Sequence, residues 1–590
     1  MTDVQIKQFR QILFWPLEIE NLSARVDQPE AGLRMAEFEA QLTKDGKWNR
    51  LDDLLSRTDK SVNAESQYLI YPPLPPESDH EADYGELMYF NPYVRRFLYG
   101  SSVSDPTGHV TGKDGKSSLP SFRLYSRQDI KKASVSLMVD SFHCSINLII
   151  NRIHFYLFDH GVVLLVVEAS VTSPLPLAQV EELLDRFRHI YPPYWETKNR
   201  EAGHCLQRVR WNNYVNAKGT HFDCTRHFRD FARTHNNPMP FEHWQYLLQP
   251  LIPWPDETKP ESFIYRLIDG ERMSFMAYLA VDDPRLLTRA DFVRLCFADG
   301  GGKSTQLPYA EDYLKDFENS YCYDRYWDPK MGYADYAFHA NPVNNWMTTR
   351  ILCCGHGFVM VGKDDPNYFT DGKNGALAHF RHHYFQMGLI AHYNKAATML
   401  LADALSEATA RLNPENTVDY QSEIKIISQR LLTFCHCNYF TEVSSQDLAR
   451  ELFSLWMRHL DTQTLLDRVK QQAREANEYI TQQEQRHQTT TTIRLTVLAA
   501  FGLAAGLIGS YLTVDWSRIK GLEANIPAHL EEVPIVGYVV VLVVFGLLFV
   551  VAKSAWLAQL LDGLADPRFK SSRWLKQKLW QWFRAIKANM

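Results

Sequence analysis

Two long hydrophobic runs interrupt an otherwise mixed pattern near the C-terminus of the chain. The first extends from Leu495 to Val514 and the second from Val533 to Ala552, and neither contains a charged residue. A bilayer core about 30 Å thick is crossed by about 20 helical residues. Both runs therefore predict transmembrane helices. Buried core helices are the alternative, but two full-length runs in succession favour the membrane.

The charges around these runs predict the orientation. The connector 515–532 holds four acids and two bases, whereas the tail 553–590 holds eight bases and two acids. Positively charged segments tend to stay on the cytoplasmic side. The first residues also lack the long apolar segment of a signal peptide. We therefore expect a multi-pass protein of the cell (inner) membrane with both termini in the cytoplasm.

Short apolar runs separated by turn residues dominate the first 370 residues, which predicts an α+β domain rich in antiparallel strands. A helix is predicted from Pro176 to Ile190, with proline at its start. The predicted strand pairs are Arg152 to Phe158 with Val162 to Glu168, Phe263 to Ile268 with Met273 to Val281, and Arg350 to Cys354 with Phe358 to Gly362.

After Asp371 the apolar spacing becomes helical, with long helices predicted over Ala376 to Leu412 and Val418 to Phe440. A third helix is predicted from Ser445, which is expected to cap it. No proline or glycine occurs from Ser445 to Phe501. This helix is therefore expected to continue unbroken into the first hydrophobic run.

The expected organisation follows from these boundaries. It comprises a cytosolic α/β domain (1–370, of one or two subdomains), a helical stalk region (371–494), a first transmembrane helix (495–514), an extracytoplasmic loop (515–532), a second transmembrane helix (533–552) and a basic cytosolic tail (553–590).

Composition narrows the functional classes. With 45% hydrophobic and 22% charged residues among 590, neither wholesale disorder nor a collagen is compatible with the chain. The net charge is −6, and most acidic residues lie before the hydrophobic runs. An acidic N-terminal part attracts cations rather than nucleic acids, so cations are the favoured partners. All nine cysteines also precede these runs, so free thiols in a reducing compartment are expected.

The long helix that leads into the first of two C-terminal transmembrane helices, beside an acidic α/β domain, resembles the CorA-like divalent cation transporter superfamily. The resemblance covers 444–512 and the second run, less than a quarter of the chain. It implies a pentamer with five copies of the first transmembrane helix around an axial pore. It also implies a divalent cation, magnesium or another, as transported or regulatory ion. The family's Gly-Met-Asn triplet is absent, because Gly509, Ser510 and Tyr511 stand in its place.

One face of the first run carries only small or polar residues, whereas Ile493, Val497 and Phe501 lie on another face. Such a face suits hydrated ions or close helix contact. Packing without conduction is the alternative, since Gly502-x-x-x-Gly506 is a common packing motif. The predicted pore-lining residues are Gln488, Thr492, Thr496, Ala499, Gly502, Gly506, Gly509, Ser510 and Thr513.

Two further groups of residues are expected at the membrane surfaces. Asp515 and Glu523 would attract cations at the outer mouth, with ordinary solvated charges as the alternative. The segment 572–587 is basic and aromatic, which predicts a helix on anionic lipid or, alternatively, a cytosolic packing helix. Its predicted interface residues are Trp574, Lys576, Trp580, Trp582 and Arg584.

Several short motifs partly match phosphate-binding or metal-binding sites, but none has the full set of residues. Ala298 to Thr305 reads ADGGGKST but lacks the spacing of a phosphate loop, so we expect a turn after a strand from Val293 to Phe297. Helical spacing would place His379 on one face with His382 or His383, as a metal site needs. Packing of these histidines is the simpler interpretation. Two cysteine pairs could bind a soft metal or be buried thiols. These residues are His379, His382, His383, Cys353, Cys354, Cys435 and Cys437.

No catalytic residues are predicted, since neither a Gly-x-Ser-x-Gly nor a His-Glu-x-x-His motif occurs. We therefore expect no enzymatic activity, and the sequence predicts no specific cofactor. The first hypothesis is a homo-oligomeric cation channel or transporter in the lipid bilayer, with a small molecule or ion as ligand of the cytosolic domain. The second is a ligand-activated membrane effector or sensor, for example in defence signalling, with little ion selectivity. The third is a non-conducting scaffold.

Overall fold

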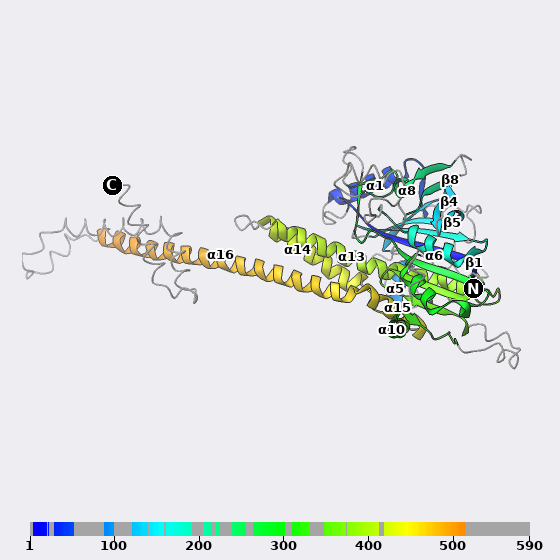
Figure 1. Cartoon of the computed structure of the whole chain (residues 1–590). Helices are drawn as coiled ribbons and strands as arrows, with labels where there is room; N and C mark the ends of the chain where they lie inside the picture. Colours follow the sequence, from blue (N-terminus) through cyan, green and yellow to red (C-terminus); the bar gives the residue numbers. More distant parts are fainter. Residues whose placement is uncertain are drawn as a thin grey trace, which may run out of the picture. The chain divides into compact units, whose positions relative to one another are not determined.

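The computed structural model describes a large mixed sheet followed by long helices (Figure 1). The described residues are 4–20, 22, 29–51, 88–99, 121–139, 142–158, 161–191, 205–213, 219–224, 239–254, 263–300, 309–329, 347–372, 374–411 and 418–513. The chain forms two compact units, Met1–Ala473 and Arg474–Met590. The mixed α+β class and the long helices agree with the sequence pattern.

The first unit is built around β1, a strand of 15 residues. The main path through the sheet is β13-β14-β15-β12-β1-β6-β5-β4-β8-β9, and among the described strands only β12–β15 and β10–β11 pair in parallel. The strands are β1 Gln5–Ile19, β2 Trp48–Arg50, β3 Phe122–Arg127, β4 Ile130–Val139, β5 Phe142–Phe158, β6 Val162–Val171, β7 Leu175–Pro176, β8 Arg208–Asn213, β9 Thr220–Asp223, β10 Ile252–Pro253, β11 Ile264–Leu267, β12 Ser274–Val281, β13 Cys322–Tyr323, β14 Arg350–Cys353 and β15 Gly357–Lys363.

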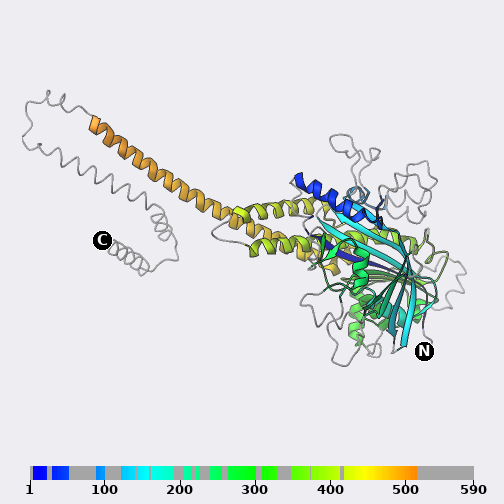
Figure 2. The same cartoon turned by 90° about the horizontal axis from the view of Figure 1, so that it is seen from above.

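Helices lie on both faces of this sheet (Figure 2). The helices of the described residues are α1 Pro29–Thr43, α5 Pro92–Tyr99, α6 Leu177–Arg186, α8 Glu242–Leu248, α9 Arg289–Phe297, α10 Glu311–Tyr321, α12 Ala376–His379, α13 Phe385–Ala410, α14 Val418–Thr433, α15 Asp447–Leu460 and α16 Thr462–Thr513. Two π-helical turns, Phe380–Tyr384 and Phe434–Asn438, and the 3-10 turn Pro284–Leu286 complete the described elements.

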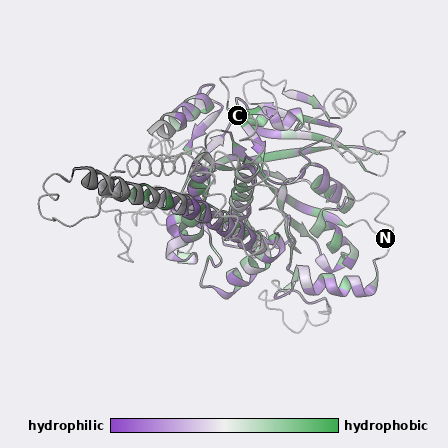
Figure 3. Ribbon diagram, turned by 90° about the vertical axis from the view of Figure 1, so that its left-hand side faces the viewer, coloured by the Kyte–Doolittle hydropathy of each residue, from purple (hydrophilic) through white to green (hydrophobic). Residues whose placement is uncertain are grey.

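Successive residues of β1 point to opposite faces of the sheet, as strand geometry requires. Leu13 belongs to the cluster that includes Leu183 and Leu184 of α6. Phe14 instead faces α13, where its ring lies 5.8 Å from that of Phe385. β6 and residues 12–17 of β1 are covered on both faces, and their sequences are accordingly almost continuously apolar. Helices of this unit show hydrophobic and hydrophilic stretches side by side in Figure 3.

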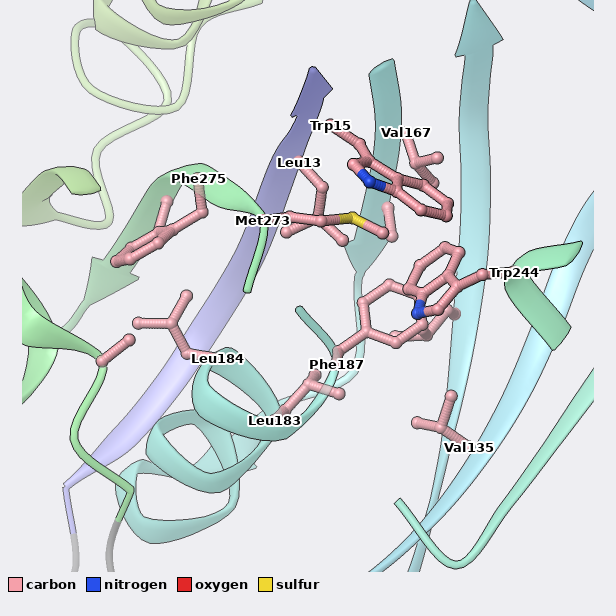
Figure 4. Packing of buried hydrophobic residues seen from close by; sticks show 14 of the residues in the cluster. Leu13, Trp15, Val135, Val167, Leu183, Leu184, Phe187, Trp244, Met273 and Phe275 are labelled. Atoms are coloured by element: carbon pink, nitrogen blue, oxygen red, sulfur yellow. The ribbon is translucent and has the colours of Figure 1, made fainter. Parts of the chain in front are cut away.

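Aromatic rings fill the α6 side of the sheet (Figure 4). Trp244 of α8 lies 5.3 Å from Phe187 and 6.3 Å from Trp15, measured between ring centroids. The indole of Trp244 donates a hydrogen bond of 2.8 Å to the carbonyl of His189. A buried tryptophan needs such an acceptor, so this bond anchors α8 beside the end of α6.

Two of the three predicted strand pairs are confirmed. β5 pairs with β6, and β14 pairs with β15, in both cases antiparallel. The predicted pair 263–268 with 273–281 is wrong, because β11 and β12 do not pair with each other. Both lie along the same edge of β1, with Leu17 opposite Leu267 and Phe14 opposite Ser274. A strand as long as β1 can pair with two short strands end to end, which a local turn signal does not reveal.

The segment 293–297 is also corrected, because it forms the end of α9 rather than a strand. Thr288 and Asp291 make a reciprocal capping box at the start of this helix. Ala298 ends it in the left-handed conformation with φ 46°. The apolar run is therefore the buried last part of a capped helix, and a short apolar run by itself does not distinguish a buried strand from a buried helix.

The predicted helices after Asp371 are present as α12, α13 and α14, and each long run contains a π-helical turn. The helix predicted from Ser445 is interrupted once and then continues unbroken into the first hydrophobic run, as α16 from Thr462 to Thr513. Asp461 adopts the left-handed conformation with φ 51° and separates α15 from α16. Gln446, not Ser445, is the first capping position, and its backbone N–H donates to Ser444 Oγ at 3.2 Å. No proline or glycine marks this break in the sequence.

Candidate functional site

The predicted pore-lining face is described for part of α16. Gln488, Thr492, Thr496 and Ala499 are exposed, and Thr496 Oγ1 donates 2.8 Å to the carbonyl of Thr492. A Cβ added at Gly502 or Gly506 would meet nothing within 4 Å in the described part of the chain.

The remaining predicted membrane residues fall at the end of α16 or beyond it. Gly509, Ser510 and Thr513 belong to α16, but their surroundings lie outside what the structure describes. The described residues do not include Asp515, Glu523, the second run 533–552 and the tail residues Trp574, Lys576, Trp580, Trp582 and Arg584. Among residues that the structure describes, no helix is long and apolar enough to cross a membrane.

Large apolar residues accompany the small ones on α16. Leu495 and Leu498 are 61% and 55% exposed. Two exposed leucines are not a contiguous apolar patch, so they do not by themselves identify a contact with lipid or with another protein.

The histidines of 379–383 do come together. Nδ1 of His379 lies 2.9 Å from Nδ1 of His383, four residues later. Tyr89 stacks on His383 with ring centroids 4.0 Å apart. Burial, with the charges of His379 and His382, lowers the pKa of His383 to about 3. No group of three histidine, cysteine or acidic residues with metal-binding geometry occurs in the described part of the chain.

The cysteine pairs are not arranged as a metal site either. All nine cysteines are free thiols. Cys353 and Cys354 are buried, and Cys354 Sγ lies 3.1 Å from the carbonyl of Cys296. Cys435 is half-buried, whereas Cys437 is exposed. This arrangement favours the buried-thiol interpretation for the first pair.

A buried charge cluster lies between the sheet and α13, and we call it the Glu168 cluster. Glu168 of β6 is fully buried, and Arg10 of β1, Arg152 of β5 and Arg381 surround it. In the strand register Glu168 is directly opposite Arg152. Three cations therefore share one carboxylate beneath a helix.

The contacts of this cluster are close. Arg10 Nη1 donates to Glu168 Oε1, and Arg381 Nε donates to the same oxygen at 3.1 Å. Arg152 Nε lies 2.5 Å from the other oxygen, Oε2. The Arg152 guanidinium also lies 3.9 Å from the ring centre of Phe385, the first residue of α13. Cation–π contact adds to its attachment there.

The π-helical turn 380–384 brings Arg381 into this cluster. A π turn inserts a residue into a helix and is frequent at functional sites. Here the carbonyl of Arg381 accepts a hydrogen bond from Arg152 Nη2 at 3.4 Å, while its guanidinium binds Glu168. Both the backbone and the side chain of this residue thus join the helix to the sheet.

The electrostatics reflect an excess of positive charge. Burial alone would raise the pKa of Glu168, but Arg152, Arg381 and Arg10 outweigh it and hold this pKa well below its ordinary value. Burial lowers the pKa of Arg10, and Arg381 and Arg152 lower it further. Burial also lowers the pKa of nearby His154 to about 3, so this imidazole is neutral near pH 7.

Sequence reasoning missed the Glu168 cluster, although a signal was present. Arg10 lies within β1, and Arg152 and Glu168 are the one Asp, Glu, Lys or Arg residue of β5 and of β6, respectively. Lysine, arginine and acidic residues are rarely buried unless they are paired. Three such residues in separate strands therefore indicate a shared polar site, but their register could not be read from the sequence.

Comparison with protein-family models, with curated proteins and with solved structures finds no match to this chain. The resemblance to CorA-like transporters therefore rests only on the sequence pattern of its C-terminal part.

Proposed function

We propose that the protein is a homo-oligomeric, CorA-like membrane channel or transporter that passes divalent cations along α16. The observation that carries this proposal is the division of the first hydrophobic run into two kinds of surface. By helical spacing Thr496, Gly502 and Gly506 fall on a small or polar face, and Ile493, Val497 and Phe501 fall on another. A helix surrounded only by lipid has no need of such a division.

In this proposal each subunit contributes one α16 to an axial pathway. Hydroxyl groups and the carbonyls beside glycines would face hydrated ions, and the large apolar residues of the other face would face lipid. The second run, 533–552, would complete the membrane part. The acidic part of the chain would raise the local cation concentration at one end of the pathway.

A ligand-activated effector with little ion selectivity is the second candidate. The observation that favours it is the absence of Gly-Met-Asn, since Gly509, Ser510 and Tyr511 occupy that place. The two functions differ in selectivity. A transporter of the first kind prefers divalent over monovalent cations in vesicle flux, whereas the effector passes both and requires a ligand of the α+β unit.

Cysteine accessibility tests the pore assignment directly. Thr496→Cys and Leu498→Cys are introduced into the full chain carrying Cys437→Ser, which removes the exposed native thiol. The protein is reconstituted in vesicles and treated with a charged, water-soluble thiol reagent. We expect residue 496 to react and its modification to reduce cation flux, because only a wet pathway admits the reagent at that depth. The Leu498→Cys protein is the matched control and should stay unmodified.

Protection of both positions would leave a dry packing contact and contradict the pore. Reaction of both positions would contradict a membrane-embedded helix. If the protein conducts no cation under any condition, even before the thiol reagent is added, the non-conducting scaffold would be favoured.

A further inference from the structure

We propose that Arg10, Arg152 and Arg381 form a binding site for a phosphate-type oxyanion, either free phosphate or the phosphate group of a larger ligand. The site lies within the α+β unit and goes beyond the proposed function. It does not depend on that function, because the binding can be measured without any ion flux.

The first argument is charge. Arg10, Arg152 and Arg381 have Glu168 as their only acidic partner in the described part of the chain. The four groups together carry an excess of about two positive charges, since arginine stays protonated in proteins. Buried charges are costly unless they are paired. A phosphate group, which carries about −1.5 to −2 charges near pH 7, matches this excess.

The second argument is hydrogen-bonding capacity. A guanidinium has five N–H donors. Within the described residues, Arg10 and Arg381 each donate one hydrogen bond, in both cases to Glu168. Arg152 is 4% exposed, and its buried Nη1 has no acceptor among the described atoms. Planar guanidinium groups bind oxyanions such as phosphate through paired N–H groups, so the unused donors suit this ligand class.

The third argument is access. The Arg10 and Arg381 side chains are 15% and 11% exposed, whereas the Glu168 side chain is 0% exposed. The carboxylate is thus shielded from solvent, whereas the Arg10 and Arg381 side chains keep part of their surface in contact with it. An anion approaching from solvent can therefore reach these two arginines. Because Arg381 belongs to the π turn that precedes α13, an anion there would join helix and sheet more firmly.

The test is binding and thermal unfolding of the full-length protein in detergent. Phosphate is titrated at constant ionic strength against chloride, and adenosine monophosphate is titrated in parallel. A ligand that binds only the folded state raises the unfolding midpoint as its concentration passes the dissociation constant. We expect saturable binding and a rising midpoint. Adenosine monophosphate binding at least about tenfold tighter than phosphate would identify a larger phosphorylated ligand, and equal affinities would identify phosphate itself.

Variants assign the binding to this cluster. Arg10→Gln and Arg381→Gln should each weaken binding about tenfold or more, because each removes charge-assisted hydrogen bonds. Glu168→Gln should tighten binding, since it removes the competing carboxylate, even if it lowers the midpoint without ligand. Arg411→Gln is the matched control, because Arg411 is exposed and pairs with Glu407 and Glu423 on the surface.

A wild-type midpoint and calorimetric signal that are the same in phosphate, adenosine monophosphate and chloride would overturn the proposal. So would binding that Arg10→Gln leaves unchanged in a variant with native circular dichroism. If Arg381→Gln does not fold, the binding of Arg10→Gln is compared with that of the wild type, because the Arg10 side chain is the more exposed of the two.

Discussion

Gly388 of α13 lies directly against Trp456 of α15. A Cβ on residue 388 would stand 2.6 Å from Cη2 of the indole, closer than side chains pack. Trp456 cannot easily withdraw, because it is fully buried and stacks on Phe358 of β15 with ring centroids 4.8 Å apart. This contact therefore fixes the distance between α13 and α15, and the distance between α15 and β15 of the sheet.

Gly388→Ala should lower the free energy of unfolding by about 1–3 kcal/mol, the usual range for overpacking a filled core. The measurement is chemical unfolding followed by tryptophan fluorescence. Gly372→Ala is the control, because a Cβ there would meet nothing within 4 Å. Equal effects of the two substitutions would mean that the indole can move aside.

Stability should fall on acidification, with His392 as one contributor. Burial, with the charge of Lys395, lowers the pKa of His392 from its ordinary 6.5 to about 3. Between these values the unfolded chain binds a proton that the folded chain does not, so stability rises with pH in this window. His392 lies 4.8 Å from Phe14, measured between ring centroids. We expect His392→Phe to reduce the slope of unfolding midpoint against pH from 6.5 to 4. The exposed His221→Phe should leave this slope unchanged.

Glu181 should act in the opposite direction. Burial, with the charge of Asp291, raises the pKa of Glu181 from its ordinary 4.5 to about 8. The folded chain thus holds an extra proton between these values, and its stability falls as pH rises through them. Glu181→Gln should raise the unfolding midpoint at pH 8.5 more than at pH 5. A shift of the same size at both pH values would show that this carboxyl is ionised in the folded protein.

Topology is a separate expectation of the membrane proposal. Reporter fusions after Met590 and near Asn525 should report opposite compartments, because one predicted span separates the two positions. The same compartment for both fusions would remove the two-span arrangement, whatever the outcome of the vesicle experiments.

Much of the α+β class and the long helices could be predicted from local patterns. Alternation and apolar runs identified β5, β6, β14 and β15, because their turns and partners are adjacent in the sequence. The uncharged runs and the small-residue face of α16 are likewise properties of the sequence itself. They support the proposal of transmembrane helices, because the length and polarity of a segment decide whether it can span the apolar core of a bilayer.

Only the tertiary structure decided the long-range relationships. β11 and β12 share one edge of β1, and the paired residues lie 246 to 275 positions apart in the sequence. Pairing over such a separation leaves no local signature. Asp461 breaks the last long helix without proline or glycine, as surrounding packing can impose a left-handed residue. The Glu168 cluster unites residues 10, 152, 168 and 381, which the sequence shows only as separate charges in apolar segments. Register across the sheet and the π turn bring them together, and neither can be read from local spacing.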